Sequence, residues 1–471
     1  MNLEGQQLLV VGLGRSGMAV ARFAASRKAI VTANDARLES ELLPEISELR
    51  EEGISVVAGS HPDGLFCGAD VIVLSPGVPL ELGPIEAARR GGTRIVGEAE
   101  FASWFLKGRM IGITGSNGKT TTTSLAGALM RSTGKEVLVG GNIGVPLTSL
   151  VGESTDSTWT VAELSSFQLE SIENLRVNVA VVTNITPDHL DRHASFEAYC
   201  VAKRNIFLNQ TAEDSAVLNG DDPVVVKMAD GIRGNKIYFS SSGSPVSGSA
   251  SIYLKGGAII GRFESGARDC EEAETEIIRT DEIPLLGLHN IENVMAATGA
   301  TICAAGPAAV DMDGIRSAIR QFKGVEHRIE FVAEISGIKF YNDSKATNVD
   351  STVKALQSFA GNIILILGGK DKGSDYTRLA PLIVERVKLI VLIGAAAEKI
   401  AGQLKGVAPM VRAGSMDDAL AKASGAGIEG DVVLLAPACA SFDMFSNYEH
   451  RGHVFKEAVL NLARSAGALK L

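Results

Sequence analysis

The sequence lacks the features that mark several classes of protein. It has no run of about 18 apolar residues that could span a bilayer, and no signal peptide precedes the first apolar segment. Cysteine is scarce: the five residues are scattered and never form a Cys-x-x-Cys pair, so neither a disulfide framework nor a zinc ribbon is expected. We therefore expect a soluble, cytoplasmic protein with reduced thiols.

Excess positive charge is also missing. The formal net charge is −10 and the isoelectric point is near 5.4, which argues against nucleic acid as a partner. The composition, 45% hydrophobic and 21% charged, is ordinary for a globular protein, and 471 residues suggest about three domains of about 150 residues each. We expect a monomer that does not insert into membranes.

Short apolar runs alternate with helical patterns along the first hundred residues. Strands are predicted at 8–11, 30–33, 55–58 and 71–74, and helices at 18–26, 44–52 and 84–90. This alternation predicts a parallel sheet with helices on its faces, and so an α/β, Rossmann-like domain at residues 1–97.

The pattern restarts twice. In residues 98–325 we predict strands at 110–114, 159–164, 177–183 and 216–218, helices at 119–132 and 290–304, and a Ser/Gly-rich surface loop at 240–251. In residues 326–471 we predict paired strands at 330–335 and 338–342, then a parallel sheet from 363–367, 389–393 and 432–435. The fold class is therefore α/β with three domains: a central P-loop ATPase-like sheet between two Rossmann-like domains.

The segment VVGLGRSG places Gly12, Gly14 and Gly17 in the G-x-G-x-x-G spacing directly after a predicted strand. Asp35 follows Gly17 by 18 residues, which is close to the acidic residue that holds a ribose in dinucleotide-binding proteins. Taken alone, the motif favours an NAD-dependent dehydrogenase. A domain that ends near residue 97 is short for a full dinucleotide fold, so the motif indicates phosphate geometry and not redox chemistry.

The segment GITGSNGKTTT, residues 112–122, is the strongest local signal. A strand, a Gly-rich turn and a Lys-Thr pair opening a helix bind nucleoside triphosphates: backbone N–H groups and Lys119 contact the phosphates, and the Thr120 hydroxyl binds Mg²⁺. The match to G-x-x-x-x-G-K-[ST] is incomplete, because Ile113 stands where the first glycine belongs.

Two further candidates lie at predicted strand ends, where ligand sites of α/β proteins gather. Glu163 follows an apolar strand and is a candidate Mg²⁺ ligand. His189 follows another strand and is four residues from His193, the spacing of a zinc-protease pair, but no glutamate follows His189 and no third ligand is evident. Lys203 by itself would be a solvated helix lysine.

The phosphate loop resembles the shortened loop of the Mur ligase family, ATP-dependent enzymes that form amide bonds in peptidoglycan precursors. The likeness continues in order through GGNIG (140–144), AELSSFQLE (162–170), TNITPDHLDRH (183–193) and Lys203, then GLHNIENV (287–294) and EHRIE (326–330). It ends with YNDSKATN (341–348), LGGKDKG (367–373) and APACASFDMFSNYEHRG (436–452). The last four segments resemble the member that adds D-glutamate to UDP-N-acetylmuramoyl-L-alanine; a sister ligase with another amino acid is the alternative.

The resemblance implies a role for each matching residue. The implied catalytic residues are Lys119, Asn142, His189, Lys203 and Lys345. The implied ATP contacts are Gly115, Ser116, Asn117, Gly118, Lys119, Thr120, Thr121, Thr122, Asn290, Asn293, Arg328 and Asp343. The implied ligands of two Mg²⁺ ions are Thr120, Glu163, His189 and a carbamylated Lys203.

The implied substrate contacts fall into two groups. The UDP part of the substrate would contact Ser16, Asp35, Arg37, Ser75 and Gly77, and Asn142 would orient its carboxylate-bearing end. D-glutamate would contact Thr347, Lys372, Ser441, Phe442 and Tyr448. Because D-glutamate carries two carboxylates, a lysine and hydroxyl donors suit it. Tyr448 stands where the family often has phenylalanine, which leaves the geometry of that contact open.

Overall fold

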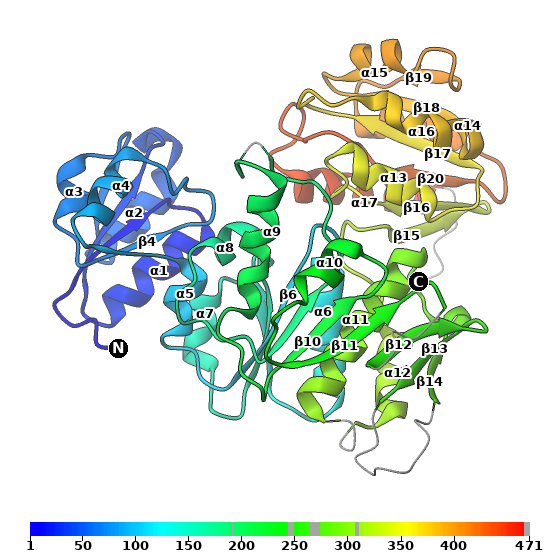
Figure 1. Ribbon diagram of the computed structural model, residues 1–471. Coiled ribbons are helices and arrows are strands. Elements are labelled where there is room, and N and C mark those ends of the chain that lie inside the picture. Colours follow the sequence, from blue (N-terminus) through cyan, green and yellow to red (C-terminus); the bar gives the residue numbers. More distant parts are fainter. Residues whose placement is uncertain (191, 244–248, 264–273, 307–309, 466–471) are drawn as a thin grey trace. The chain divides into compact units, whose positions relative to one another are not determined.

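The computed structural model describes residues 1–190, 192–243, 249–263, 274–306 and 310–465 (Figure 1). In this part of the chain the strands form three sheets. The chain divides into two compact units: Met1–Ile283 with Ile291–Phe322, which hold the first two sheets, and Pro284–Asn290 with Lys323–Leu471, which hold the third. This three-domain α/β architecture confirms the predicted fold class. None of the described helices is long and apolar enough to cross a membrane.

The first sheet has the order β3-β2-β1-β4-β5, and every neighbouring pair is parallel. Its strands are β1 (Gln7–Val11), β2 (Ile30–Asp35), β3 (Ser55–Ala58), β4 (Val71–Leu74) and β5 (Arg94–Gly97). The helices are α1 (Arg15–Ser26), α2 (Leu43–Glu51), α3 (Asp63–Cys67), α4 (Gly83–Arg90) and α5 (Glu98–Ser103).

Alternate residues of β1 face opposite sides of this sheet, because successive side chains of a strand point to opposite faces. Leu8 and Val10 belong to a core with residues of α1 and α2, whereas Leu9 and Val11 belong to another core with residues of α3 and α4. Helices therefore cover both faces, and ligand-binding residues gather at the carboxyl ends of the strands.

The second sheet has the order β14-β13-β12-β11-β10-β9-β6-β8-β7 and is parallel from β7 to β12, with β13 antiparallel to both of its neighbours. The first five strands are β6 (Arg109–Thr114), β7 (Val137–Gly141), β8 (Trp159–Glu163), β9 (Val179–Val182) and β10 (Ser215–Asn219). The rest are β11 (Asn235–Ser240), β12 (Ala250–Lys255), β13 (Ala258–Arg262) and β14 (Glu274–Arg279). The helices are α6 (Lys119–Ser132), α7 (Leu147–Leu150), α8 (Ser166–Glu170), α9 (Phe196–Arg204), α10 (Pro223–Met228), α11 (Leu288–Ala305) and α12 (Met312–Gln321).

The predicted surface loop at 240–251 is wrong at its ends. Ser240 closes β11, and Ala250 opens β12, which pairs with β11 in parallel. Residues 244–248 lie outside the described residues. The start of β12 was not expected because serine and glycine residues are typical of surface loops. Ser251 is nevertheless buried in the sheet.

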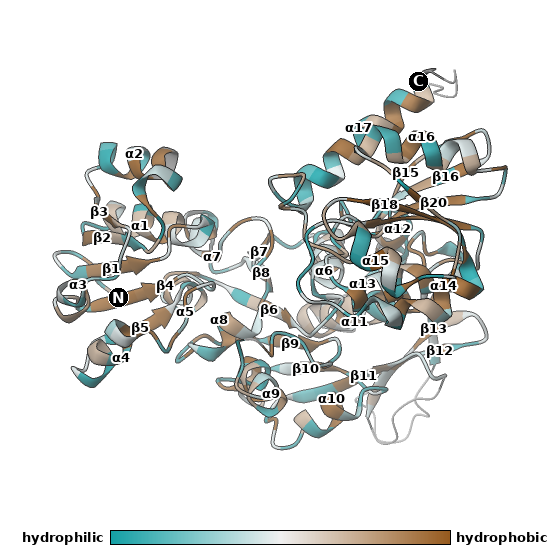
Figure 2. Cartoon of the chain, turned by 90° about the horizontal axis from the view of Figure 1, so that it is seen from above, coloured by the Kyte–Doolittle hydropathy of each residue, from teal (hydrophilic) through white to brown (hydrophobic). Residues whose placement is uncertain are grey.

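The third sheet has the order β15-β16-β20-β17-β18-β19; β15 and β16 are paired, as predicted, and antiparallel, and the other pairs are parallel. Its strands are β15 (Glu330–Ile335), β16 (Ile338–Asn342), β17 (Ile363–Gly368), β18 (Val387–Ile393), β19 (Met410–Arg412) and β20 (Val432–Leu435). The helices are α13 (Val349–Gln357), α14 (Ala380–Arg386), α15 (Ala397–Gln403), α16 (Met416–Ala426) and α17 (Tyr448–Ser465). The interior strand β20 is hydrophobic along its length, and β18 is hydrophobic except at the exposed Lys388 (Figure 2).

Candidate active site

The turn after β1 brings two stretches of backbone together. Gly12 has φ +89°, a conformation that favours glycine, and a Cβ at Gly17 would lie 1.9 Å from the carbonyl oxygen of Gly12. Gly14 is the N-cap of α1, and a Cβ there would meet nothing within 4 Å. The first turn of α1 has no side-chain cap and no acidic residue, so its leading N–H groups suit an anion.

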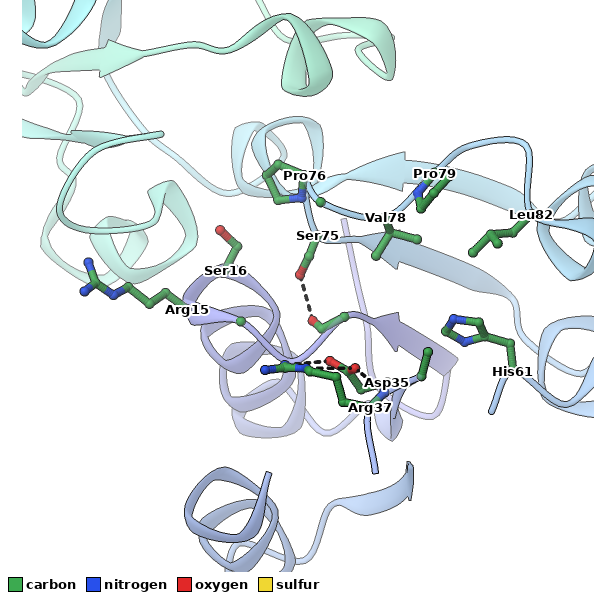
Figure 3. Close-up of a pocket in the computed structure, with 14 residues that line it drawn as sticks. Arg15, Ser16, Asp35, Arg37, His61, Ser75, Pro76, Val78, Pro79 and Leu82 are labelled. Carbon is green, nitrogen blue, oxygen red and sulfur yellow. Dashed lines mark hydrogen bonds and ion pairs between the residues drawn. The ribbon is translucent and has the colours of Figure 1, made fainter. Parts of the chain in front are cut away.

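A cavity of about 620 Å³ lies beside this turn (Figure 3). All the UDP contacts predicted in this domain line it: Ser16, Asp35, Arg37, Ser75 and Gly77. Arg15 and His61 line it as well, and sequence reasoning missed both. The position of Arg15 inside the Gly-rich motif was a usable signal, whereas His61 is brought to the cavity only by the fold.

Asp35 binds the protein itself. Its Oδ2 accepts hydrogen bonds from the Leu13 N–H at 2.7 Å and from Arg37 at 2.8 Å, and its Oδ1 accepts the Arg37 N–H at 2.9 Å. Burial works to raise the pKa of Asp35, but the Arg37 and Leu13 hydrogen bonds outweigh burial and hold the pKa below its usual value. The ionised carboxylate therefore fixes the Arg37 guanidinium beside the cavity.

The loop between β6 and α6 requires glycine at two positions. Gly115 has φ +147° and Gly118 has φ +84°, both left-handed conformations. A Cβ at Gly115 would lie 2.0 Å from Oγ1 of Thr183, and one at Gly118 would lie 2.3 Å from Oδ1 of Asn293. The same Asn293 oxygen accepts a hydrogen bond from Thr122 at 3.2 Å, so this predicted adenine contact also supports the loop.

Further contacts hold the loop against the segment after β9. The Ser116 hydroxyl is 2.9 Å from the Tyr199 hydroxyl, and it also donates to the Thr186 carbonyl at 2.9 Å. The Asn117 N–H donates to Oδ1 of Asn184 at 2.9 Å. Thr120 and Thr121 are buried in the first turn of α6. Contacts within the protein thus hold the loop in its conformation.

Two lysines from different helices converge on one carbonyl oxygen of this loop. The Gly115 carbonyl accepts hydrogen bonds from Nζ of Lys119 at 2.8 Å and from Nζ of Lys203, in α9, at 2.7 Å. Lys203 is only 1% exposed, and burial, aided by the charge of Lys119, lowers the pKa of Lys203 well below its usual value. The charge of Lys119 beside a Gly-rich loop makes a site suited to polyanions.

Glu163 ends β8 beside this site and is 2% exposed. Its Oε1 accepts a hydrogen bond from Nδ2 of Asn142 at 2.7 Å, whereas its Oε2 is buried with no hydrogen-bond partner among the described residues. An unpaired buried carboxylate oxygen is costly and is the ligand type that hard cations prefer. This donor fits the predicted Mg²⁺ ion.

The two histidines of the predicted segment both pack against the ring of Phe167. Phe167 has its ring centroid 5.1 Å from that of His189 and 5.3 Å from that of His193. His193 is buried, with Nε2 3.0 Å from the Ser166 hydroxyl and Nδ1 3.0 Å from Oε1 of Glu170. His189 has φ +53° and a half-exposed side chain. His193 is therefore structural, and His189 remains the candidate ligand.

The loop after β9 also contacts the rim of the first cavity. Arg192 donates a hydrogen bond from one guanidinium nitrogen to the Gly77 carbonyl at 3.1 Å, and its guanidinium lies 4.9 Å from the Phe167 ring centroid. Gly77 lines the cavity after β4. Within this unit, Arg192 joins the segment that carries His189 to the cavity that takes the predicted UDP group.

In the other unit, Asp343 follows β16 and is buried. Burial raises the pKa of Asp343 to about 7, although the charge of Arg328 and a hydrogen bond from the Ile329 N–H oppose the increase. His327 and Ile329, on either side of Arg328, have φ +64° and +43°. Non-glycine residues in this region are strained, and such strain clusters at ligand sites.

Lys345 and Tyr448, from two different motifs, are in direct contact. Nζ of Lys345 donates a hydrogen bond to the Tyr448 hydroxyl at 2.9 Å and lies 4.6 Å from the centroid of its ring. The structure therefore brings together a predicted catalytic residue and a predicted D-glutamate contact.

The loops that carry the other predicted D-glutamate contacts are joined by backbone hydrogen bonds. Lys370 and Ala440 exchange N–H···O bonds of 2.8 and 3.1 Å, which places the loops after β17 and β20 side by side. Lys372 is exposed on the first loop; on the second, Ser441 is buried and Phe442 is 66% exposed. The Thr347 N–H donates to the Lys345 carbonyl at 2.8 Å and so belongs to the neighbouring turn.

Glu326, His327 and His453 form a further cluster, with ligand atoms within 4.8 Å of one another. Lys456 donates to Oε1 of Glu326 at 2.7 Å, so that carboxylate already has a cation. Nδ2 of Asn342 lies 2.9 Å from Nδ1 of His327 and donates a hydrogen bond to it. Nδ1 is therefore the acceptor, and the imidazole proton lies on Nε2, which then has no lone pair to offer a metal. We assign no metal to this cluster.

Three family models match the chain in order. The description "Mur ligase MurD-like, N-terminal domain" covers residues 6–97, "Mur ligase middle domain" covers 113–301, and "Mur ligase, glutamate ligase domain" covers 327–439. A UDP-N-acetylmuramoylalanine–D-glutamate ligase of Acidobacterium capsulatum is 51% identical over 98% of this chain and 97% of that protein. One of the same name from Koribacter versatilis is 48% identical over 98% of this chain and 99% of that protein. The chain belongs to the Mur ligase family.

Solved structures show the same Mur ligase fold. UDP-N-acetylmuramate-alanine ligase MurC of Thermotoga maritima has a TM-score of 0.60 at 19% identity and covers 97% of this chain and 100% of its own. A pseudomurein peptide ligase type C of Methanothermus fervidus has a TM-score of 0.56 at 20% identity, with coverage of 97% and 100%. As a Mur ligase, this chain is an ATP-dependent enzyme that forms amide bonds, and the family generally requires ATP and Mg²⁺. The roles of its individual residues stay predictions.

Proposed function

We propose that this Mur ligase joins the amino group of D-glutamate to the L-alanine carboxylate of UDP-N-acetylmuramoyl-L-alanine, splitting ATP to ADP and phosphate. The names of the relatives, at 48–51% identity over 98% of the chain, support this substrate pair. The structural observation that carries the proposal is the convergence of Lys119 and Lys203 on the Gly115 carbonyl, next to the buried Glu163.

A carboxylate does not react with an amine in water at a useful rate, so the reaction needs two displacements. First a carboxylate oxygen attacks the γ-phosphorus, the bond to the bridging oxygen breaks, and ADP leaves an acyl phosphate. The amine of D-glutamate then attacks the acyl carbon, loses a proton, and expels inorganic phosphate. Both steps gather negative charge, which positive groups must stabilise.

We assign the triphosphate to the loop of residues 115–122, with Lys119 on the β- and γ-phosphates. We also assign nucleotide contacts to Asn290, Asn293, Arg328 and Asp343. Lys345 would meet the phosphates, and Asn142 would orient the substrate carboxylate. These roles rest on the resemblance and on the donor chemistry of each side chain.

Thr120, Glu163, His189 and Lys203 would hold two Mg²⁺ ions. Bound Mg²⁺ neutralises phosphate charge and orients the phosphoryl group. As an ammonium, Lys203 would repel a cation; as a carbamate formed with carbon dioxide it would offer an anionic oxygen. Its burial and the neighbouring Lys119 favour the neutral amine that such a reaction requires. We therefore include a carbamylated Lys203 in the proposal.

We assign the UDP group to the cavity beside α1, through Ser16, Asp35, Arg37, Ser75 and Gly77. D-glutamate would contact Thr347, Lys372, Ser441, Phe442 and Tyr448. We propose domain boundaries near residues 97 and 325. A cytoplasmic monomer remains our prediction, and light scattering checks the oligomeric state.

The decisive experiment measures amino-acid-dependent phosphate release with ATP and UDP-N-acetylmuramoyl-L-alanine. The amino acids screened are L-alanine, D-glutamate, meso-diaminopimelate, L-lysine and D-alanyl-D-alanine. We expect release with D-glutamate alone, and a preference for any other would identify a sister ligase. Titration with NAD is the second arm: micromolar binding would favour the dehydrogenase alternative.

A further inference from the structure

Two motifs that are about one hundred residues apart meet in the third sheet's unit. Lys345 lies in the turn after β16, and Tyr448 opens α17. The Tyr448 hydroxyl accepts a hydrogen bond from Nζ of Lys345 at 2.9 Å, and its ring lies 4.6 Å from the same nitrogen. One tyrosine therefore offers the ammonium group both an acceptor and an aromatic face.

The backbone beneath this pair is fixed by a buried arginine. Arg451, in the first turns of α17, is 0% exposed and donates to the Ser344 hydroxyl at 2.9 Å and to the Ser344 carbonyl at 2.7 Å. The Ser344 hydroxyl in turn donates to the Tyr448 carbonyl at 2.8 Å. Arg451 also donates to the Cys439 carbonyl at 3.1 Å.

These hydrogen bonds distinguish the Lys345–Tyr448 pair from an ordinary surface contact, because they hold the backbone of both residues. The residue before Lys345 and the carbonyl of Tyr448 are tied to each other, and the Lys345 N–H donates to the His327 carbonyl at 3.1 Å. These hydrogen bonds hold the backbone around Lys345, so the side chain of Lys345 is what remains to be ordered. A lysine side chain loses considerable rotamer freedom when it is held in one place. A partner that already holds the ammonium lowers the entropy lost when a phosphate binds.

We propose that Tyr448 is a positioning residue that acts on phosphoryl transfer through Lys345, and that this role replaces the D-glutamate contact which the resemblance implies for Tyr448. The inference rests on the proposed function, because it takes Lys345 as the phosphate-facing lysine. A phenylalanine at position 448 would keep the aromatic face and lose the acceptor. The hydroxyl of this chain thus contributes an acceptor that helps to orient the ammonium group.

The test compares Tyr448→Phe with Tyr341→Phe, which removes a tyrosine hydroxyl from β16 in the same unit. Tyr341 packs its ring against Phe331 and Phe359. We expect Tyr448→Phe to lower kcat/KM for ATP by at least about tenfold, the lower end of the effect of losing one charge-assisted hydrogen bond. The KM for D-glutamate, the melting temperature and all properties of Tyr341→Phe should remain as in the wild type.

A double-mutant cycle with Lys345→Met decides between the two roles. If Tyr448 acts through Lys345, Tyr448→Phe changes the rate of the Lys345→Met enzyme by less than about twofold. Additive effects, or a rise in the KM for D-glutamate with ATP unaffected, would overturn the inference. The assays use whichever amino acid the wild-type enzyme accepts, so a wrong choice of amino acid shows in the wild type, before any variant is compared.

Discussion

The exposed Asn142 is hydrogen-bonded to the buried Glu163, and its amide satisfies only one of the two carboxylate oxygens. The hydrogen bond to Oε1 is 2.7 Å long, and Oε2 has no hydrogen-bond partner in the part of the chain that the structure describes. Asn142 thereby orients Glu163 and leaves the second oxygen available. Orientation of a metal ligand by a neighbouring hydrogen bond is a common feature of metal sites.

Glu163→Gln removes the charge at almost constant shape. We expect activity to fall by at least about 100-fold, because an amide is a weak ligand for a hard cation. The melting temperature should not fall, since the variant removes a buried charge that has only one hydrogen bond. Steady-state assays over a range of Mg²⁺ concentrations and thermal melts check this, with the exposed Glu153→Gln as control. Normal activity in Glu163→Gln would exclude Glu163 as a ligand.

Two glycines of the first motif should respond differently to alanine. Gly17→Ala places a Cβ 1.9 Å from the Gly12 carbonyl, so the turn must shift, and we expect a loss of about 1–3 kcal/mol in stability. Gly14→Ala has open space around the new Cβ. It should leave the melting temperature unchanged but weaken binding of UDP, because the methyl group obstructs the approach of the diphosphate. Calorimetry with UDP and thermal melts separate the two effects. Equal UDP affinity in Gly14→Ala and the wild type would contradict the assignment of the diphosphate to this turn.

The sequence was sufficient for most of the strands because β-branched and leucine runs mark buried parallel strands. The strands at 55–58, 71–74, 330–335, 338–342 and 432–435 have the predicted bounds. The strands that were not predicted are the edge strands β5, β7, β14 and β19 and the interior strands β11, β12 and β13. Some of them are short or polar: β19 has three residues, and β14 carries Glu274 and Glu276. Such strands are specified by their neighbours in the sheet, which a local pattern does not contain.

The candidate site could be predicted only in part. Residue types and spacing pointed to Lys119 and Glu163, and the resemblance added Lys203, which the pattern of α9 would have left as a solvated lysine. The neighbouring residues in the sequence do not predict that Lys203 is buried against the Gly115 carbonyl. They also do not predict that Arg451 is hydrogen-bonded to Ser344 and so connects α17 to it. These contacts join residues distant in the sequence, so they follow from tertiary packing.

Lys203 should be almost indispensable. We expect Lys203→Ala to be nearly inactive and to regain part of its activity with formate or acetate, which would occupy the space of the carbamate. Protein equilibrated with ¹³C-bicarbonate should show a carbamate carbon signal that Lys203→Ala lacks and that the exposed Lys227→Ala keeps. A fully active Lys203→Ala enzyme would contradict the assignment, and an unchanged carbamate signal would place the modification on another lysine.

Lys372 and Lys370 provide a matched pair on one loop. Lys370 is tied through its backbone to Ala440, whereas Lys372 is assigned to a carboxylate of D-glutamate. Losing one charge-assisted contact costs about 1.5–3 kcal/mol, or roughly 10- to 150-fold in affinity. Lys372→Ala should therefore raise the KM for D-glutamate and leave the KM for ATP unchanged, and Lys370→Ala should alter neither. A rise in the KM for ATP in Lys372→Ala would make Lys372 a phosphate contact instead.

Asp343 predicts how stability depends on pH. Burial raises its folded-state pKa to about 7, above the unfolded value of 3.8, so the folded state binds the proton more tightly. The resulting stabilisation is complete below the unfolded pKa and is lost as the pH rises through about 7; roughly 4 kcal/mol is at stake. Asp343→Asn imitates the protonated acid at every pH, so its melting temperature should exceed that of the wild type by a small margin at pH 5 and by several degrees at pH 8. The exposed Asp417→Asn should follow the wild type at both values. Calorimetric melts decide the matter: a constant offset between Asp343→Asn and the wild type from pH 5 to pH 8 would show that Asp343 is ionised throughout this range, held so by Arg328.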